Sequence, residues 1–494
     1  MLRRAAILLT ALSLCFACDG GADTPDGSTP TTDGSTPPPT DGGGSTPDAQ
    51  VNPDGGGTTD PDGGVGPSPS VCADRTAEIV AATGPTITVS PAGDRVMVDG
   101  EMRTLRQVVS GAAEGTTILL EDGTYTIPEA SGGGYSGLYF TTPNVTLRSA
   151  SGDASAVILD SAYRLHGGQT APITVDAAGV VLSGFTVRRS VFHLIHLWKD
   201  ADDVVIHDVH MIDGGQQFLK ASPGDAHRVD RVEVSCSRFV MTDEGRDNVW
   251  GYGSQTGNTR CYTGGIDTHE SRDWHVHDSY FEGIYCTPDG PRRPVHGRAP
   301  DARGGMTYTG GLSEHAIHMW DSDEGSGHLI ERNHIVDCAR GIGIGFRADV
   351  YGSIIRNNMI FSRLPAGGQN DVGISVERSH DTMVLNNTVF YSNPEAYSSR
   401  MEYRYGVTSG LVMKNNLTNG RIRARDGASA DLGSNVTEAE ASWFVDAAGG
   451  DLHLASCDVA AVVGAGESLS EVTVDIDGDP RGDSNDIGAD DCAE

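Results

Sequence analysis

The sequence is poor in lysine and in aromatic residues, and acidic residues far outnumber basic ones. Only three of its 494 residues are lysine (Lys199, Lys220 and Lys414), and Phe, Trp and Tyr together make up 6%. The 35 basic residues stand against 68 acidic ones, which gives a formal net charge of −33. Because nucleic-acid binding depends mainly on Lys and Arg that neutralise phosphate, we predict no nucleic-acid partner, and binding to an anionic membrane surface is disfavoured as well.

The first 71 residues are predicted to lie outside the folded body. Residues 1–18 combine two arginines with an apolar run that ends at Ala17-Cys18, the pattern of an export signal followed by a lipidated cysteine. Residues 19–71 are rich in Gly, Pro, Ser and Thr, contain nine Asp and lack Lys and Arg, which predicts a disordered linker. We therefore predict lipidation at Cys18 and an outer-membrane or cell-surface protein that meets the membrane only through this anchor, with plain secretion as the alternative.

Seven cysteines remain once Cys15 leaves with the signal and Cys18 takes a lipid. Export predicts an oxidising compartment in which cysteines pair, and an odd number leaves one of them free. We expect Cys457 to pair with Cys492 near the C-terminus, and we expect one local bridge within a group of three. That group is Cys236, Cys261 and Cys286. No cysteine spacing resembles a zinc site.

Short apolar runs that end in asparagine repeat along the chain. Asn333, Asn358, Asn387 and Asn416 end four such runs and fall 25, 29 and 29 positions apart. Short strands rich in Val and Ile at this period, separated by Gly and Asn, indicate a solenoid and exclude a helical repeat. We predict an all-β fold over residues 72–454, a monomeric, single-stranded, right-handed parallel β-helix. Its corner asparagines are expected to stack into a ladder and to adopt the left-handed turn conformation.

Both ends of the solenoid are predicted to be covered. Thr104 to Ala113 is a short amphipathic stretch, and the strand after it ends in Asp122-Gly123-Thr124-Tyr125. This resembles the pectate-lyase-like superfold, whose members commonly open with a capping helix and a strand that ends in Asp-Gly-x-Tyr. Residues 455–494 are predicted to form a C-terminal cap segment. Its run from Asp475 to Asp479 also resembles a calcium loop, so the cofactor is left open with Ca²⁺ as the candidate.

The strands upstream of each corner carry the candidate functional residues. If Ile195, Leu219, Ile266 and Ile317 point inward, the period-two alternation of a strand sends two columns of side chains outward. The first column is His196, Lys220, Asp267 and His318, and the second is Trp198, Ser222, His269 and Trp320. The next coils carry small residues there, so the face suits a sugar chain that stacks on the aromatic rings.

Two long insertions are predicted to bulge from the coil beside these columns. They span about residues 242–263 and 286–313, and long loops on a rigid scaffold often carry function. The second contains Arg292, Arg293, His296, Arg298 and Arg303. Such a basic set suits carboxylates or sulfates.

Two family resemblances bear on the activity. Segments such as Gly265–His269, Glu314–Trp320, Cys338–Gly345 and Glu402–Arg404 resemble a family of uncharacterised bacterial exported β-helix proteins. The chain is also similar to the alginate and chondroitin-B lyase family, in which a strand motif carries a catalytic lysine and the next coil carries an Arg-His pair. Leu219–Ser222 matches the lysine motif, and Thr268-His269 stands at the pair, so the family's arginine is absent. This resemblance implies catalytic roles for Lys220 and His269.

The leading hypothesis is a polysaccharide lyase that cleaves a uronate-containing polymer by β-elimination. Lys220 or His269, beside Asp267, would act as the base, and His318 would protonate the leaving oxygen. Arg340 or an arginine of the insertion would neutralise the substrate carboxylate. Substrate contacts are assigned to Trp198, Trp320, His196, Arg347 and Arg404.

Two other functions stay open from the sequence. Glycoside hydrolysis needs paired carboxylates, and Asp267 with Asp321 or Glu314 are the candidates. The second alternative is a protein without catalysis that binds glycans or partner surfaces. At single positions, His196 could be an ordinary surface polar group, and Trp320 could pack beneath an insertion.

Overall fold

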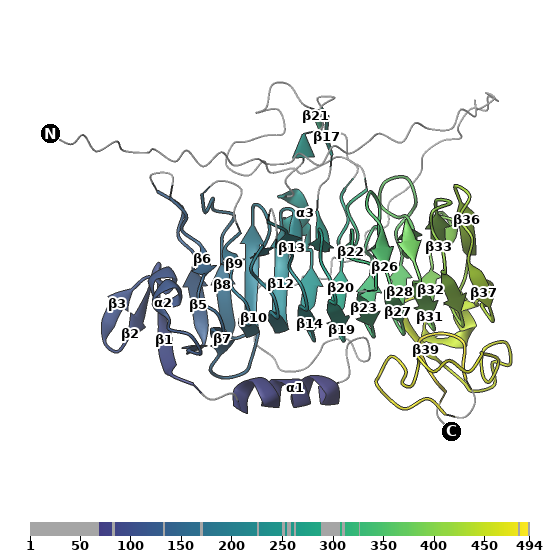
Figure 1. Ribbon diagram of the computed structural model, residues 1–494, viewed down its shortest axis with the longest axis horizontal. Helices are drawn as coiled ribbons and strands as arrows, with labels where there is room; N and C mark the ends of the chain where they lie inside the picture. Colours follow the sequence, from purple (N-terminus) through teal and green to yellow (C-terminus); the bar gives the residue numbers. More distant parts are fainter. Residues whose placement is uncertain are drawn as a thin grey trace, which may run out of the picture. The chain divides into compact units, whose positions relative to one another are not determined.

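The computed structural model describes residues 69–492, with gaps at 82–83, 132–133, 168–170, 225–226, 249–251, 254–257, 261–262, 288–306, 309–311, 326 and 483–484. These residues belong to the compact unit Gly64–Glu494. They form the predicted right-handed parallel β-helix, in which successive coils add parallel strands to three sheets (Figure 1). The export signal, Cys18, nearly all of the linker, part of the first insertion and most of the second lie outside the described residues.

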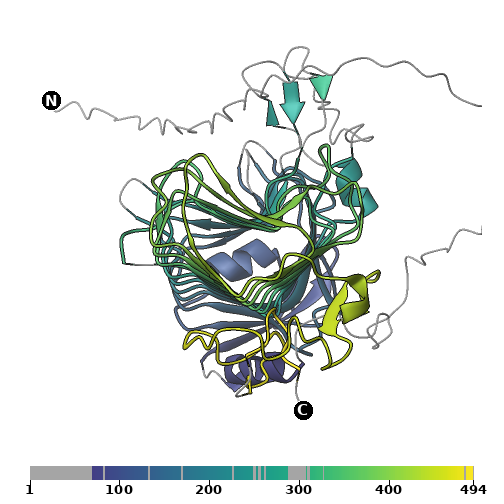
Figure 2. The ribbon, with the colours of Figure 1, turned by 90° about the vertical axis from the view of Figure 1, so that its right-hand side faces the viewer.

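Three parallel sheets line the hydrophobic core, as the view along the coil shows (Figure 2). Sheet 1 contains β1 (Thr86–Ala92), β4 (Thr117–Leu120), β7 (Thr146–Ser149), β10 (Val181–Ser190), β12 (Val205–Gly214), β14 (Glu233–Ser235), β19 (His275–His277), β23 (Leu329–Glu331), β27 (Ile354–Arg356), β31 (Met383–Leu385), β34 (Val412–Lys414) and β37 (Asp431–Gly433). Sheet 2 contains β5 (Gly123–Thr126), β8 (Val157–Asp160), β15 (Arg238–Val240), β20 (Tyr280–Glu282), β24 (His334–Val336), β28 (Met359–Ser362), β32 (Thr388–Tyr391) and β35 (Leu417–Thr418). The long strands β10 and β12 pair in both sheets and join them.

Sheet 3 carries the candidate site. It contains β6 (Leu138–Phe140), β9 (Ile173–Val175), β11 (Ile195–Trp198), β13 (Gln217–Ser222), β18 (Gly264–Thr268), β22 (Ile317–Met319), β25 (Ile342–Ile344), β29 (Ile374–Glu377), β33 (Ser399–Arg404) and β36 (Arg421–Arg425). Its inward residues Ile195, Leu219, Ile266 and Ile317 pair in register and are fully buried, as predicted. Burial of each such side chain contributes about 1.5–3 kcal/mol.

Smaller elements decorate the coil. They are β2 (Arg95–Val98), β3 (Glu101–Arg103), α3 (Asp243–Asp247), β16 (Tyr252–Gly253), β17 (Asn258–Arg260), β21 (Thr307–Tyr308), β26 (Val350–Tyr351), β30 (Ser379–His380), the 3-10 helix Ala441–Trp443, β38 (Phe444–Asp446) and β39 (Asp451–Leu454). Among the described residues, no helix is both long enough and apolar enough to span a membrane.

The corner between sheets 1 and 2 is held by the predicted asparagine ladder. The Oδ1 atom of Asn358 accepts hydrogen bonds from the backbone N of Asn333 at 3.1 Å and from its Nδ2 at 3.0 Å. Asn387 repeats both contacts one coil further on, toward Asn358. The predicted left-handed conformation occurs one residue before each ladder asparagine and not at the asparagine itself. The residues with positive φ are those just before the ladder, such as Asn357 (52°) and Arg332 (51°), because the chain turns before the buried amide enters the stack.

The N-terminal end is covered by the predicted cap. Helix α2 (Leu105–Gly111) begins at Thr104, whose side chain forms a capping box with Gln107. Leu105, Val108 and Val109 are buried in the same core cluster as the sheet residues. In the view along the coil, α2 lies across the core at its N-terminal end (Figure 2). The helix therefore covers apolar side chains that the first coil would otherwise expose.

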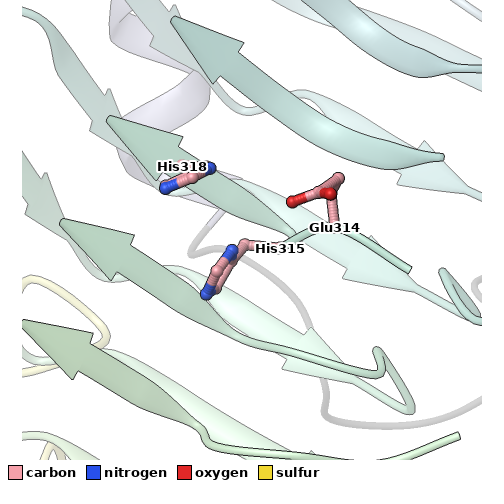
Figure 3. A group of neighbouring side chains, drawn as sticks. All are labelled: Glu314, His315 and His318. Carbon is pink, nitrogen blue, oxygen red and sulfur yellow. The ribbon is translucent and has the colours of Figure 1, made fainter. Parts of the chain in front are cut away.

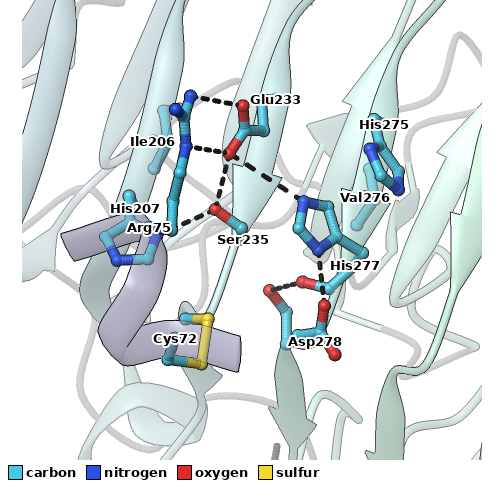
Figure 4. A network of polar contacts seen from close by, with 12 residues as sticks. Cys72, Arg75, Ile206, His207, Glu233, Ser235, His275, Val276, His277 and Asp278 are labelled. Carbon is cyan, nitrogen blue, oxygen red and sulfur yellow. Dashed lines mark hydrogen bonds and ion pairs between the residues drawn. A yellow bond between two sulfur atoms is a disulfide. The ribbon is translucent and has the colours of Figure 1, made fainter. Parts of the chain in front are cut away.

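Helix α1 (Pro69–Ala81) was not predicted, and it packs against the outer face of sheet 1 (Figure 4). A disulfide joins Cys72 to Cys236 at the corner of a coil, 164 positions away. Arg75 makes a two-pronged contact with Glu233, at 2.8 and 2.6 Å. The Thr76 hydroxyl lies 2.8 Å from Nε2 of His207. A covalent bond, an ion pair and a hydrogen bond thus fasten the helix to the two neighbouring strands β12 and β14 and to the corner that follows β14.

The remaining cysteines agree with the prediction only in part. Cys457 and Cys492 form the predicted disulfide. Of the three cysteines in which one local bridge was expected, Cys236 takes no part in such a bridge, because folding brings it beside Cys72. Cys286 is also disulfide-bonded, whereas Cys261 lies outside the described residues. Within the part of the chain that the structure describes, the free cysteine is Cys338, which is buried.

The segment after residue 454 packs along the outer face of sheet 2. Its Val462, Ile476 and Ile487 are buried against side chains such as Phe361 and Phe390. The corner asparagines bind this segment, since Nδ2 of Asn386 donates to the carbonyl of Asp486 at 2.9 Å. In the run that resembles a calcium loop, Asp475 accepts hydrogen bonds from the backbone of Asp477 and Asp479, and Asp477 pairs with His453 at 3.2 Å. These aspartates are engaged within the segment.

Substitution of a ladder residue is expected to destabilise the whole coil. In Asn358→Ala, the buried N and Nδ2 of Asn333 lose their acceptor, and the carbonyl of Ile330 loses a donor. Because each unsatisfied buried group costs about 1–3 kcal/mol, the free energy of unfolding should fall by at least about 3 kcal/mol. Urea unfolding followed by circular dichroism measures this. The exposed Ser398→Ala serves as the control, and equal stability of the two variants would contradict a structural role for the ladder.

Candidate functional site

The first outward column on sheet 3 has the register that the sequence predicts. His196 pairs with Lys220, Lys220 with Asp267, and Asp267 with His318 on adjacent strands. The same column continues through Gly343 and Ser375 to Glu402. Four chemically active side chains therefore lie side by side on the outer face, and glycine and serine follow them.

Asp267 is the centre of this cluster. Its Oδ2 forms an ion pair with Nζ of Lys220 and lies 3.4 Å from Nε2 of His269. Its Oδ1 accepts a hydrogen bond from Nε1 of Trp320 at 2.6 Å and lies 3.4 Å from Nδ1 of His318. Asp267 is only 2% exposed. One buried carboxylate thus holds four of the predicted site residues.

The charge of Asp267 is stabilised by its neighbours. Burial by itself raises the pKa of this carboxyl, but the charge of the adjacent Lys220 outweighs that effect and helps to hold the pKa well below its ordinary value. Asp267 is therefore an anion at neutral pH. Lys220, itself 8% exposed, is thus the cation of a buried ion pair.

Lys220 also contacts the second predicted base. Its Nζ lies 2.9 Å from Nε2 of His269. An ammonium group has only donors, so Lys220 donates and Nε2 of His269 accepts in this bond. The side chain of His269 is 23% exposed, the largest fraction in the Lys220, Asp267, His269 and His318 group. A proton donor and a proton acceptor thus lie in direct contact near the surface.

His318 is less accessible than predicted for a group that protonates a substrate. It is 3% exposed, and its Nε2 lies 3.0 Å from the carbonyl oxygen of Gly345. Its Nδ1 side faces Asp267. The ring also lies close to Trp320, with centroids 5.3 Å apart. The geometry suits a residue that positions Asp267 and Trp320.

Sequence reasoning missed two further histidines on this face. His315 stacks on His318 with ring centroids 4.6 Å apart, and His193 lies 5.5 Å from His196. Alternation assigns both to the inside, since each is two residues before an inward isoleucine. Bends at Ala316 and Leu194, just before the strands, turn them outward instead. A bend just before a strand leaves no alternating pattern in the sequence. Only the local density of histidine could therefore have indicated that His193 and His315 lie on this face.

Most of these histidines are neutral. Burial lowers the pKa of His315 well below its ordinary value, and the nearby His318 and Arg340 lower it further. Burial and the charge of Lys220 lower the pKa of His193 to about 4. Burial also lowers the pKa of His196 well below its ordinary value. Neutral imidazoles can accept protons or bind metal ions.

An aromatic rim borders the cluster. Trp320 packs edge-to-face on Phe346, with centroids 5.2 Å apart, and the ring of His269 lies 4.4 Å from Trp320. Phe346 is 38% exposed, and Trp198, beside His196, is 37% exposed. Exposed rings on both sides of a polar cluster give sugar rings apolar faces on which to stack.

The three predicted arginines differ in their partners. Arg340 pairs with Asp371 at 3.1 Å, and Arg404 pairs with Glu377 at 3.3 Å and with Asp426 at 2.7 Å. Arg347 is exposed, lies 6.0 Å from the Trp320 ring centroid, and makes no ion pair with any described residue. Arg347 is therefore the arginine of this set with a charge available to a substrate. The insertion arginines, Arg292 to Arg303, lie outside the described residues.

The carboxylates considered for glycoside hydrolysis are not arranged as an exposed pair. Asp267 is buried and bound on both oxygens. Asp321 accepts a hydrogen bond from the backbone of Glu270, and burial raises its pKa. Glu314 lies at the edge of the cluster near His315 and His318. A buried anion that already has four partners is poorly placed to approach a glycosidic bond.

Two groups of side chains within the described residues could hold a metal ion. Glu314, His315 and His318 form one, in the candidate site, and His453, Asp477 and Asp490 form the other, in the C-terminal segment. In each group the potential ligand atoms lie within 4.8 Å of one another. The first group uses His318, which the sequence analysis had assigned to acid catalysis.

Comparison with known proteins finds similarity in structure only. No protein-family model and no curated protein matches the chain. A pectate lyase, Pel9A, is 15% identical with a TM-score of 0.43, and the match covers 83% of this chain and 97% of that one. A GH136 lacto-N-biosidase from Eubacterium ramulus is 9% identical with a TM-score of 0.40, over 74% and 70%. An alginate lyase from Paenibacillus sp. is 13% identical with a TM-score of 0.35, over 64% and 99%. The strand register, and not these similarities, defines the fold described above.

Removal of the central charge is expected to destabilise the site strongly. Asp267→Asn keeps the size of the side chain but leaves Lys220 buried without its counterion. Loss of one partner of a buried pair costs about 3–5 kcal/mol, so the free energy of unfolding should fall by that order. Urea unfolding at neutral pH measures the change. In the control Asp203→Asn, the exposed pair with Arg231 is screened by water, and the loss should stay below about 1 kcal/mol. Equal losses would contradict the central role of Asp267.

Proposed function

We propose that this protein is a carbohydrate-active β-helix enzyme, a polysaccharide lyase that cleaves a uronate-containing polymer by β-elimination. The observation that carries the proposal is the contact between Lys220 and His269, 2.9 Å apart and held by the buried Asp267. This contact lies on the outer face of sheet 3, beside exposed aromatic rings. Elimination needs one base, one acid and a cation for the carboxylate, and the cluster supplies each of them.

The proton transfers follow from the hydrogen bonds. Nε2 of His269 takes the proton α to the uronate carboxyl group, in competition with the ammonium of Lys220. The electron pair of the broken C–H bond forms the new C=C bond, and the glycosidic C–O bond breaks. Lys220 gives its proton to the leaving oxygen. The proton on His269 then returns to Lys220 across their shared hydrogen bond, which restores the starting state.

The remaining residues bind and position the polymer. Arg347 neutralises the uronate carboxylate, because among Arg340, Arg347 and Arg404 it is the one without an acidic partner in the described residues. Trp198, Trp320 and Phe346 stack on sugar rings. His196, whose Nε2 lies 3.0 Å from the hydroxyl of Ser222, lines the same face. Arg404 and Arg340 support this face through their own ion pairs.

The site favours elimination over hydrolysis. Hydrolysis by paired carboxylates requires both groups to reach the glycosidic bond, and Asp267 is enclosed by Lys220, His269, His318 and Trp320. In the elimination, the same carboxylate acts by holding Lys220 charged and in place. The enclosed position of Asp267 thus disfavours hydrolysis and serves elimination.

We further propose that the enzyme is exported and tethered through a lipid on Cys18. The disulfides Cys72–Cys236 and Cys457–Cys492 are consistent with an oxidising compartment. The acidic linker would then hold the body away from the membrane.

The activity test is a screen of uronate polymers. A lyase produces an unsaturated uronate that absorbs in the ultraviolet, whereas a hydrolase raises reducing ends without that absorbance. Lys220→Ala and His269→Ala should each lower kcat by about 100-fold or more, the usual contribution of general acid or base catalysis. Lys199→Ala, at an exposed lysine beside β11, is the matched control and should retain full activity.

Several outcomes would contradict the proposal. Reducing ends without ultraviolet absorbance would indicate hydrolysis. Glycan binding without a product signal in either assay would indicate a binding protein. Full activity in Lys220→Ala and His269→Ala would show that the chemistry occurs elsewhere.

The tether is tested separately. Cells that express the full chain should incorporate a labelled fatty acid into it, and Cys18→Ser should abolish the label and release the protein from the membrane fraction. Cys15→Ser is the control for cysteine loss in the same segment and should keep the label. Labelling that persists in Cys18→Ser would contradict the anchor.

A further inference from the structure

Glu314, His315 and His318 converge on one point at the start of β22 (Figure 3). One potential ligand atom of each lies within 4.8 Å of the other two. His318 is the outward residue of the strand, and the bend at Ala316 turns His315 to the same face. The backbone N of Glu314 donates to the carbonyl of Thr263 at 2.7 Å, which fixes the start of the segment. Three ligand-type side chains within five residues are therefore held by regular strand pairing.

In both His315 and His318, the Nε2 atom has a polar partner, whereas the Nδ1 atom lacks a hydrogen bond. Nε2 of His315 lies 3.2 Å from the hydroxyl of Ser375, and Nε2 of His318 lies 3.0 Å from the carbonyl of Gly345. The Nδ1 atom of each ring is buried without a hydrogen-bond partner, and that of His318 has the Asp267 carboxylate 3.4 Å away. Histidines that bind metal ions usually donate their other N–H to an oxygen in this way, which fixes the ring and aims the free nitrogen. Both rings are more than nine-tenths buried, so water does not readily satisfy those nitrogens.

The glycines around the cluster make room for it. A Cβ atom at Gly343 would lie 2.7 Å from Nε2 of His315, so the ring occupies the space that a side chain would take. A Cβ atom at Gly264 would lie 3.0 Å from Cβ of Glu314. Both positions face the cluster from adjacent strands. The open stretch of sheet 3 that follows His318 is thus filled by an imidazole ring.

The surrounding charges suit a cation. Glu314 makes no hydrogen bond or ion pair through its carboxylate within the described residues, and Asp267 adds a second carboxylate 3.4 Å from Nδ1 of His318. The nearby cations are already paired, Lys220 with Asp267 and Arg340 with Asp371. A bound cation would therefore meet uncompensated negative charge from Glu314.

We propose that Glu314, His315 and His318 bind one divalent transition-metal ion of the zinc class, with a further coordination position left for water or substrate. Two imidazole nitrogens and one carboxylate oxygen form the donor set of many catalytic zinc sites. Calcium and magnesium prefer oxygen ligands throughout, so they are poor competitors here. The site stands on geometry alone and does not depend on the proposed β-elimination.

The test is equilibrium binding to the full chain with its disulfides intact. After treatment with a chelator, the protein is titrated with Zn²⁺ by calorimetry and with Co²⁺ by visible absorption, which reports nitrogen ligation directly. His315→Ala and Glu314→Gln should each remove one equivalent of bound ion or weaken it by more than about 100-fold, beyond the usual effect of outer-shell changes. Ser375→Ala, which removes the partner of His315, should weaken binding by about 10–100-fold.

Controls separate this site from other binding. His193→Ala removes the other histidine that a bend turns outward on the same face, outside the cluster, and it should bind the ion as the unchanged protein does. Glu314→Gln lies at the edge of the strand, so its circular dichroism should match the unchanged protein even if His315→Ala folds poorly. An ion that survives in both His315→Ala and Glu314→Gln, or that is lost only in His453→Ala, would overturn the proposal. The absence of saturable Zn²⁺ and Co²⁺ binding would overturn it as well.

Discussion

The structure depends on one constraint, the parallel register that places each residue directly above its equivalent in the neighbouring coil. The ladder from Asn333 to Asn416 enforces this register, because each amide binds the backbone and the side chain of the coil before it. A slip by one residue would break these buried bonds and would turn the inward isoleucines of sheet 3 toward solvent. The same register aligns residues that are distant in sequence, such as Lys220, Asp267 and His318, into one column.

The candidate site is an electrostatic consequence of that column. A buried carboxylate is costly unless its neighbours compensate it, and Asp267 is compensated by a cation and by donors on both of its oxygens. Because those partners come from adjacent strands, their spacing is set by the sheet and not by loops. The group around Asp267 and the cluster of Glu314, His315 and His318 share this scaffold, and His318 belongs to both.

Much of the scaffold could be predicted from the sequence, because it repeats. The inward Ile266 and Ile317 and the outward column follow from the alternation of side chains within each strand. The corner asparagines follow from the longer repeat, which is one coil of the solenoid. The predictions failed at features of the structure that do not repeat along the sequence. The bend at Ala316 reverses the direction of His315, and no alternation rule foresees it. Likewise, nothing in the local sequence indicates that the partner of Cys236 is Cys72, which is 164 positions away. The choice of Arg347 over Arg340 depended on Asp371, whose proximity only the fold reveals.

Helix α1 gives the chain an unusual path for mechanical load. A pull on the chain ahead of residue 72 passes through the Cys72–Cys236 bond into the corner of a middle coil. The strands from β1 to β14 lie on the chain between these two cysteines, so they carry little of the tension. A solenoid pulled from its first coil could peel open one strand at a time, whereas here the load enters where coils on both sides resist it. A load applied ahead of residue 72 thus enters the solenoid at its flank, and the first coils carry little of it for as long as the disulfide remains oxidised.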